Sequence, residues 1–206
     1  MKKTILSILI IMSFSYGNGC LLVQSGDLNV SWTGYKTIDK IGVSGVFTDI
    51  DYRPNQKEGK NFEELFVGSS VAINLEKIDT KNEARDKNLV KNFFSLLAGD
   101  RINAKIVAIK ADKKEKGKRV YHGDLDVNLT MNNRSRVIPM RYSYHKGKFE
   151  AKGTLNIYAF DGDMPLRNLS NSCRKLHKGV TWFEVAIAFN TTIEATLCHV
   201  ETKGEK

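Results

Sequence analysis

The sequence is poor in proline, and none of its apolar runs has the length of a membrane-spanning helix. Three prolines among 206 residues exclude collagen-like and Pro-rich chains. The apolar run over residues 5–14 is too short to cross about 30 Å of hydrocarbon. Apolar residues still make up 41% and charged residues 27% of the chain, which excludes a disordered or fibrous composition. The length fits one folded domain.

Motifs for several common chemistries are also missing. The chain contains no GxSxG, no HExxH and no GxxxxGKS/T sequence. Its four histidines lack the paired spacing of metal ligands, and nothing supplies a nucleophile–base pair. The sequence therefore predicts a protein that is not an enzyme and that holds no metal or cofactor.

Basic residues outnumber acidic residues by 32 to 23, which gives a formal net charge of +9. This charge permits nucleic acid, anionic lipid or an acidic ligand as a partner and does not choose among them. The tyrosines and lysines between Arg141 and Lys152 follow a strand alternation, so we interpret them as a solvated sheet face and expect no nucleic-acid partner.

The N-terminal segment has the order of a secretory signal peptide. Lys2 and Lys3 precede the apolar residues 5–14, and small residues follow. We expect residues 1–19 to be the signal peptide and residues 20–206 to form the exported mature domain, in which disulfides are permitted.

Alternation of apolar and polar residues dominates the body of the chain. It is longest between Phe183 and Leu197, and it recurs in segments that begin near residues 28, 43, 67, 102, 121, 138 and 149. Asn132-Asn133 and Lys146-Gly147 are typical of tight hairpin turns. About eight long antiparallel strands indicate an all-β fold that closes as an up-and-down β-barrel.

Two segments predict helices in the connections. Residues Glu83–Ala98 carry apolar side chains at helical spacing, and Gly99 is a plausible terminator. Residues Met164–Lys178 have Pro165 near their start and Gly179 just after their end, which is the expected asymmetry of a helix.

The three cysteines are Cys20, Cys173 and Cys198. The first and last strands of a closed barrel are neighbours, and in an antiparallel pair the start of one faces the end of the other. We therefore expect a Cys20–Cys198 disulfide and a free, buried Cys173. Lipoprotein processing at Cys20 competes with this bridge and would anchor the protein to a membrane. Gly17 and Asn18 match a lipobox poorly.

One segment carries a family resemblance. Asp79-Thr80 is followed by Arg85-Asp86, then by Leu89 and by Phe93-Phe94. This order resembles the signature of the YceI-like family, exported polyisoprenoid-binding proteins with a lipocalin-like barrel. The family implies an eight-stranded antiparallel lipocalin-like barrel and, with the signal peptide, a periplasmic location.

Other segments agree with this resemblance from about Leu28 to Ala195. Residues 45–50 resemble the second strand of the family, residues 123–139 its hairpin, and residues 149–153 its seventh strand. A proline that the family usually has after the helix is missing between residues 104 and 109. The segment around Cys173 is longer than the usual connection.

Strand parity and the resemblance together imply a lipid-binding lumen or mouth. The expected ligand-binding residues are Trp32, Phe47, Ile73, Arg85, Phe93, Tyr142, Phe149 and Phe189. An apolar lumen of this kind would bind and shield a polyprenol, a polyprenyl phosphate or a quinone by burial. The basic exterior favours transient contact with an anionic membrane surface.

Two other functions remain open at this stage. A barrel packed solid would act in stress protection or as an adaptor, without lipid. An enzyme that uses Cys173 would need a base that the sequence does not supply.

Arg85 has two interpretations. It can pair with Asp79 or a neighbouring carboxylate and fix the corner between strand and helix, or it can hold a diphosphate or quinone head group. Asp86 is favourable near the start of a helix, where backbone N–H groups are unpaired.

Asn29 and Asn128 lie in extended acidic sequons of the kind used for bacterial N-glycosylation. Both fall in expected strands, which disfavours the modification. We therefore interpret both asparagines as residues of the sheet.

Overall fold

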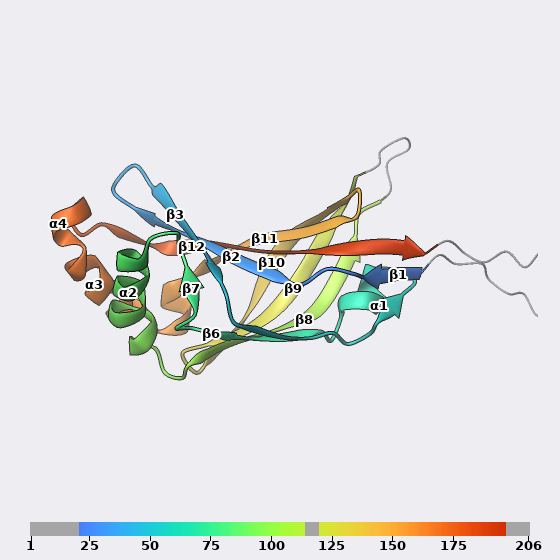
Figure 1. Cartoon of the computed structure of the whole chain (residues 1–206), viewed down its shortest axis with the longest axis horizontal. Helices are drawn as coiled ribbons and strands as arrows, with labels where there is room; N and C mark the ends of the chain where they lie inside the picture. Colours follow the sequence, from blue (N-terminus) through green and yellow to red (C-terminus); the bar gives the residue numbers. More distant parts are fainter. Residues whose placement is uncertain (1–20, 114–119, 197–206) are drawn as a thin grey trace, which may run out of the picture.

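Figure 1 shows the computed structural model of the chain, which describes residues 21–113 and 120–196. The strands are β1 (Leu21–Gln24), β2 (Asn29–Lys36), β3 (Ile41–Phe47), β4 (Ile50–Arg53), β5 (Glu58–Gly59), β6 (Ser70–Asn74), β7 (Ile78–Asp79), β8 (Arg101–Ala111), β9 (Tyr121–Met131), β10 (Arg134–His145), β11 (Lys148–Asn156) and β12 (Thr181–Thr196). The helices are α1 (Phe62–Phe66), α2 (Glu83–Asn92), α3 (Asp163–Ser172) and α4 (Arg174–His177), with 3-10 turns η1 (Phe94–Leu96) and η2 (Ile157–Phe160).

The strands form one antiparallel sheet that curls back on itself. Its order is β4-β6-β8-β9-β10-β11-β12-β2-β3-β7. The two ends of this path meet, because β4 follows β3 along the chain and β7 follows β6. The N–H of Asn74 donates to the carbonyl of Asp49 at 3.1 Å, and the N–H of Thr48 donates to that of Lys77 at 2.8 Å. The lipocalin-like all-β fold expected from the sequence is confirmed.

The number of strands differs from the expected eight, because twelve are found in the described residues. Much of the difference comes from interruptions. β1 and β2 both pair with β12, at Ile193–Thr196 and at Thr181–Asn190. The chain turns at Thr48-Asp49 between β3 and β4, so one expected strand becomes two.

The two tight hairpin turns are confirmed. β9 and β10 are joined through Asn132 and Asn133, with φ angles of 51° and 57°, the left-handed conformation of a type I′ turn. β10 and β11 are joined through Lys146 and Gly147, with φ angles of 48° and 83°.

A strand expected from the sequence is shorter than predicted, and a short helix that was not expected precedes it. The alternation from residue 67 predicts a strand to residue 77, but β6 covers only Ser70–Asn74. α1 precedes it, capped by the side chain of Asn61, which accepts from the N–H of Glu64 at 2.8 Å. Leu65 and Phe66 are each only 1% exposed, so this helix contributes two side chains to the core.

Both expected helices form, but each is interrupted. The first ends at Asn92, because Phe93 leaves the helical region with φ −135° and turns towards the core. The second is divided at Cys173 into α3 and α4. Cys173 is buried and free, as expected. Its sulfur accepts a hydrogen bond from the Nδ2 of Asn88 at 3.3 Å, which joins α3 to α2.

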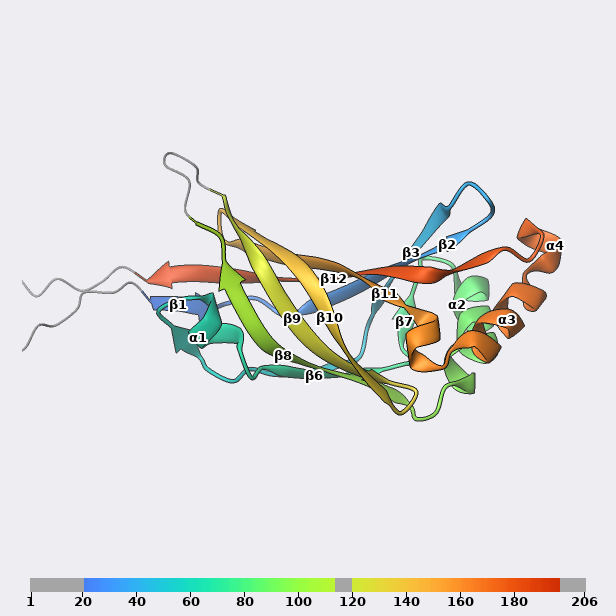
Figure 2. The same cartoon turned by 180° about the vertical axis from the view of Figure 1, so that it is seen from behind.

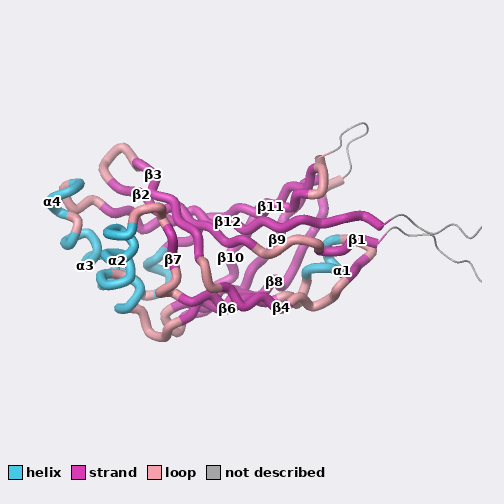
Figure 3. Tube along the Cα trace, viewed as in Figure 1, coloured by secondary structure: helices cyan, strands magenta, loops and turns pink. Residues whose placement is uncertain are grey.

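The helices lie at the two ends of an elongated molecule. Figures 1 and 2, which view opposite sides, place α2, α3 and α4 at one end and α1 with β1 at the other. Figure 3 shows the long strands of the sheet running between these ends. Across residues 21–113 and 120–196, no helix has the length and apolar character needed to cross a membrane.

Candidate functional site

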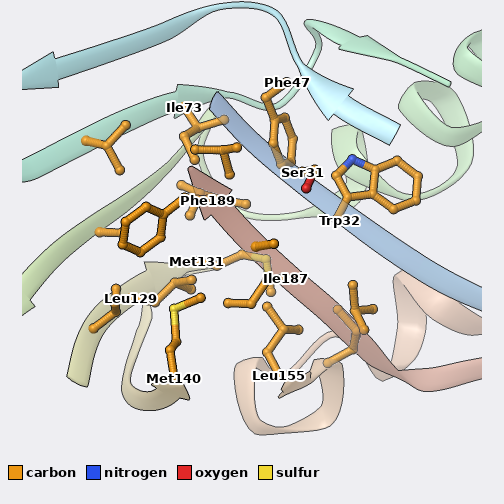
Figure 4. A pocket seen from close by; sticks show the side chains of 18 of the residues that line it. Ser31, Trp32, Phe47, Ile73, Leu129, Met131, Met140, Leu155, Ile187 and Phe189 are labelled. Carbon is orange, nitrogen blue, oxygen red and sulfur yellow. The ribbon is translucent and has the colours of Figure 1, made fainter. Parts of the chain in front are cut away.

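A cavity of about 180 Å³ lies inside the curled sheet, against α2 and α3. Figure 4 shows the side chains that converge on it. The cavity-lining residues include Val30, Trp32, Phe47, Ile73, Leu89, Phe93, Leu129, Met131, Met140, Leu155, Leu166, Leu169, Ile187 and Phe189. An apolar cavity of roughly 150 Å³ is enough to stay dry and bind a small hydrocarbon. This cavity therefore offers a site for an apolar chain.

Trp32 of β2 forms one wall, and its position depends on a glycine. Its cross-strand partner is Gly45 of β3. A Cβ at Gly45 would lie 2.6 Å from Cζ2 of Trp32 and 2.9 Å from Cγ2 of Thr80, so only glycine leaves room for the indole. Edge-to-face contacts continue to Phe94, whose ring centre lies 6.5 Å from that of Trp32 and 6.2 Å from that of Phe47.

The cavity wall holds two buried polar atoms without a partner. The indole Nε1 of Trp32 and the hydroxyl of Thr181 make no hydrogen bond to any described residue. Trp182 differs, because its Nε1 donates to the carbonyl of Thr37 at 2.7 Å. Leaving a buried donor unpaired costs about 1–3 kcal/mol. A ligand oxygen next to Trp32 would remove that cost.

Charge is nearly absent from this wall. Lys105 is the one charged residue among the described residues that line the cavity, and it is an exposed residue of β8. Tyr52 also lines the cavity, and its hydroxyl donates to Oε1 of Gln24 at 2.8 Å. Burial raises the pKa of Tyr52, so its hydroxyl is neutral at physiological pH. The site suits an uncharged group.

A layer of aromatic rings fills the barrel beyond the cavity. Phe149 lies at its centre and is fully buried. Its ring centre is 4.8 Å from that of Phe66, 5.1 Å from that of Tyr142, 5.2 Å from that of Phe62 and 6.0 Å from that of Phe189. We call Phe62, Phe66, Tyr142 and Phe149 the aromatic layer. It divides the interior into two parts.

A second hollow of about 590 Å³ lies on the far side of the aromatic layer. Its wall includes Leu22, Phe62, Tyr121, Tyr142, Tyr144 and Ala195, with Glu63, Lys110, Asp112 and Lys113. The hydroxyl of Tyr142 is buried without a partner in the described chain, and burial raises its pKa. The wall of this hollow includes several charged side chains, in contrast to the apolar cavity.

Arg85 lies outside both spaces and stabilises a corner. Its Nε donates to the hydroxyl of Thr80 at 2.9 Å and its Nη2 to the carbonyl of Thr80 at 2.8 Å. Asp79, the partner considered from the sequence, instead forms an ion pair with Lys81. Asp86 accepts from the N–H of Thr80 at 3.0 Å. The corner interpretation fits these contacts, although Thr80 and not Asp79 is the partner.

The eight residues expected at the ligand site fall in three places. The cavity is lined by Trp32, Phe47, Ile73, Phe93 and Phe189. Tyr142 and Phe149 belong to the aromatic layer, and Arg85 to the corner.

Several cavity-lining residues were not among those eight. Leu129, Met131, Met140, Leu155 and Ile187 all line the cavity. Each shares the inward parity of its strand, so the signal was present in the sequence. The prediction of the ligand site favoured aromatic residues and therefore left out these aliphatic ones.

Three further expectations concern a disulfide, two sequons and metal binding. Cys20 and Cys198 lie outside the described residues, so the expected disulfide remains a prediction. Asn29 and Asn128 do lie in strands, β2 and β9. Over the described ranges, no cluster of three or more His, Cys, Asp or Glu side chains is placed to hold a metal ion.

The sequence matches the model of the YceI-like domain over residues 24–196. The chain belongs to the YceI-like family. A search among curated proteins finds no match. The family match covers all the strands and helices of the sheet and its connections apart from the first residues of β1.

Solved structures share the fold of this YceI-like domain. A polyisoprenoid binding domain from Saccharophagus degradans, implicated in plant cell wall breakdown, is 9% identical with a TM-score of 0.56, covering 85% of this chain and 98% of that one. Burkholderia cenocepacia BcnA is 14% identical with a TM-score of 0.53, covering 82% and 99%. A mutant of the Campylobacter jejuni YCEI protein is 16% identical with a TM-score of 0.51, covering 95% and 99%.

Proposed function

We propose that this YceI-like domain binds an isoprenoid-type lipid in the apolar cavity and shields it from water, without catalysing a reaction. The observation that carries this proposal is the cavity itself, apolar on nearly every side and containing an unpaired indole N–H. Burial contributes about 0.8 kcal/mol per CH2 group, so a branched hydrocarbon chain supplies its own driving force.

The cavity favours a neutral oxygen on the ligand. Polyprenols, quinones and polyprenyl phosphates share the isoprenoid chain and differ at the head. A phosphate needs cationic partners or several N–H donors, and Lys105 is an exposed residue rather than an inward cation. The Nε1 of Trp32 suits one neutral acceptor. We therefore propose a polyprenol or a quinone, with its oxygen next to Trp32.

The N-terminal pattern supplies the setting for this function. The sequence over residues 1–19 has the order of a signal peptide, which supports export to the periplasm. An isoprenoid chain is insoluble in that aqueous compartment, so its transfer or storage requires an apolar cavity that shields it from water. The name of the Saccharophagus degradans domain, a polyisoprenoid binding domain, agrees with this class of ligand.

A packed barrel with an adaptor or stress-protection role is the second candidate, because the aromatic layer fills part of the interior. Phe149 and Tyr142 are 0% and 1% exposed and stack at 5.1 Å. In this candidate the whole interior behaves like that layer and takes up no lipid.

The first experiment identifies the cargo and then tests the donor. The mature protein is purified from its native host and examined by native mass spectrometry and by mass spectrometry of an organic extract. Added polyprenol, ubiquinone and squalene are then titrated against the wild type and Trp32→Phe. We expect Trp32→Phe to weaken polyprenol and ubiquinone binding by about three- to tenfold, because it removes one hydrogen-bond donor.

Squalene is the control ligand, since it is an isoprenoid hydrocarbon without oxygen. Its affinity should be the same for wild type and Trp32→Phe. An equal loss for squalene would mean that the ring shape matters and the N–H does not. A protein that carries no lipid and takes up none of the three would favour the packed barrel.

A further inference from the structure

Two aliphatic side chains project into solvent at the helical end of the molecule. Ile38, at the tip of the β2–β3 hairpin, is 81% exposed, and Leu176, on α4, is 82% exposed. These are the most exposed large apolar side chains among the described residues. The residues on both sides of each in the sequence are polar or charged.

The hairpin tip lies against the segment that follows α4. The N–H of Thr37 donates to the carbonyl of Val180 at 3.3 Å, and the Nε1 of Trp182 donates to the carbonyl of Thr37 at 2.7 Å. The ammonium of Lys40 lies 4.3 Å from the centre of the Trp182 ring. Figures 1 and 2 both show the hairpin tip and α4 at this same end.

Cations flank one of these two side chains, that of Leu176. Arg174, Lys175 and Lys178 flank Leu176 and are exposed, while Asp39 is the one acidic residue in the hairpin tip. Lys40 is neutralised by Glu184, whose Oε2 is 2.7 Å away. The three exposed cations around Leu176 have no acidic residue between them in the sequence. This end of the molecule is therefore complementary to an anionic surface.

The same end adjoins the apolar cavity. Thr181 and Trp182 line that cavity and also begin β12, directly after the loop that Thr37 contacts. A lipid passing between a bilayer and the cavity would travel the shortest path if this end faced the bilayer.

We propose that the hairpin tip (Thr37–Lys40) and α4 form a docking end that inserts Ile38 and Leu176 into the surface of an anionic lipid bilayer. Two exposed aliphatic side chains beside the cations of α4 match a bilayer, where the apolar tips enter the acyl boundary and the cations remain at the headgroups. The charge of α4 favours a bilayer with anionic headgroups over an uncharged partner. The purpose of this surface rests on the proposed lipid function, but docking itself requires no cargo.

Vesicle co-sedimentation of the mature protein tests this surface. The vesicles are phosphatidylcholine alone or a 3:1 mixture of phosphatidylcholine and phosphatidylglycerol, without added isoprenoid. We expect the wild type to bind the anionic vesicles more tightly. The double variant Ile38→Ser with Leu176→Ser should lose about tenfold or more in affinity, because two apolar insertions disappear.

The charge variant Lys175→Gln with Lys178→Gln should lose about 25-fold, since each lysine near an anionic surface contributes on the order of a factor of five. It should bind phosphatidylcholine vesicles as the wild type does. Two matched controls should retain wild-type binding. Val137→Ser removes an apolar side chain that is 57% exposed on β10, and Lys57→Gln with Lys60→Gln removes two exposed lysines near α1.

Thermal unfolding of each variant verifies that it is folded. Equal losses in the controls and in the docking variants would overturn the proposal, as would a wild type that binds neither vesicle. Self-association that depends on Ile38 and Leu176, seen by sedimentation velocity, would assign this end to a second copy of the chain. A protein that docks but takes up no isoprenoid would keep the docking end and refute the proposed cargo.

Discussion

Thr80 is the residue around which the corner between β7 and α2 is built. It is 5% exposed, and its polar atoms are shared between two consecutive side chains of α2. Its hydroxyl donates to Asp86 and accepts from Arg85, and its carbonyl accepts a second bond from Arg85. Every polar atom of this buried residue is therefore satisfied by the start of one helix.

We expect Arg85→Ala to destabilise the domain without changing lipid affinity. The variant leaves the buried carbonyl of Thr80 without its side-chain donor, which should lower the free energy of unfolding by about 1–3 kcal/mol. Urea unfolding measures the stability, and titration with ubiquinone measures the affinity of the folded protein. Lys87→Ala is the control, because its exposed pair with Glu83 contributes little. A loss of ubiquinone affinity with an unchanged free energy of unfolding would instead assign Arg85 to the ligand site.

Individual inward residues could be assigned from the sequence, but their environments could not. Strand parity placed Trp32, Phe47 and Phe149 on the inner face. Strand parity does not determine which inward ring lines a cavity and which packs against another ring. That distinction depends on α1, whose Phe62 and Phe66 enter the barrel and pack against Phe149.

At the scale of secondary-structure elements, the alternation of apolar and polar residues failed to predict the short ones. α1 has five residues, less than two helical turns, and its sequence fits a strand edge equally well. The long strands were predictable because they are amphipathic over many residues. The second helix is interrupted at Cys173, whose sulfur contacts Asn88 of α2, and no local pattern encodes that contact.

Three neighbouring strands are joined at the outer surface by one arginine. Arg141 of β10 donates from Nη1 to Oδ1 of Asp124 on β9 at 2.9 Å and to Oδ1 of Asp112, directly after β8, at 3.0 Å. A second bond runs from Nη2 to the other oxygen of Asp112. The hydrogen bonds from Arg141 lower the pKa of Asp112 below its usual value of 3.8.

This lowered pKa predicts a pH-dependent contribution to stability. A carboxyl whose folded pKa is depressed stabilises the protein above its unfolded pKa and loses that effect as the pH falls through the folded value. We expect the difference in unfolding free energy between wild type and Asp112→Asn to be constant near neutrality and to vanish as the pH drops below 3.8. Urea unfolding between about pH 2.5 and 7 measures this difference in unfolding free energy. The upper limit of this range lies about three pH units above the unfolded pKa.

Arg141→Gln supplies the matched background for this test. In that background, Asp112→Asn should no longer produce a pH-dependent difference, because the donor that lowers the pKa of Asp112 is gone. A difference that persists in both backgrounds to the lowest pH would show that Asp112 stabilises the sheet by other contacts.

At the scale of the whole molecule, closure of the sheet was predictable and its unequal filling was not. Antiparallel alternation and two type I′ turns are enough to indicate a barrel. One part of the interior is packed by the aromatic layer and the other part is hollow. Such a division results from the volumes of side chains that pack against one another across the barrel. These contacts join residues that are far apart in the sequence.

The pairing of the first and last strands bears on the expected disulfide. Leu21 is the cross-strand partner of Thr196, so the described chain starts and stops within two residues of Cys20 and Cys198. We expect alkylation in denaturant to label one thiol, that of Cys173, and to label all three cysteines after reduction. Intact mass spectrometry of the exported protein measures the number of labelled thiols before and after reduction. Three labelled thiols without reductant, or a mass increase from acyl chains on Cys20, would exclude the bridge.

The ladder between β1 and β12 has a consequence for how the protein can be held. Leu21 and Thr196 lie at the end of the molecule opposite α4 (Figure 1). Any tether joined to either terminus, whether an acyl anchor or a purification handle on a sensor chip, would pull on that end. The hairpin tip and α4 would then point away from the surface to which the chain is fixed. A tethered copy would be oriented to reach a facing bilayer across the gap, and not the membrane that holds it.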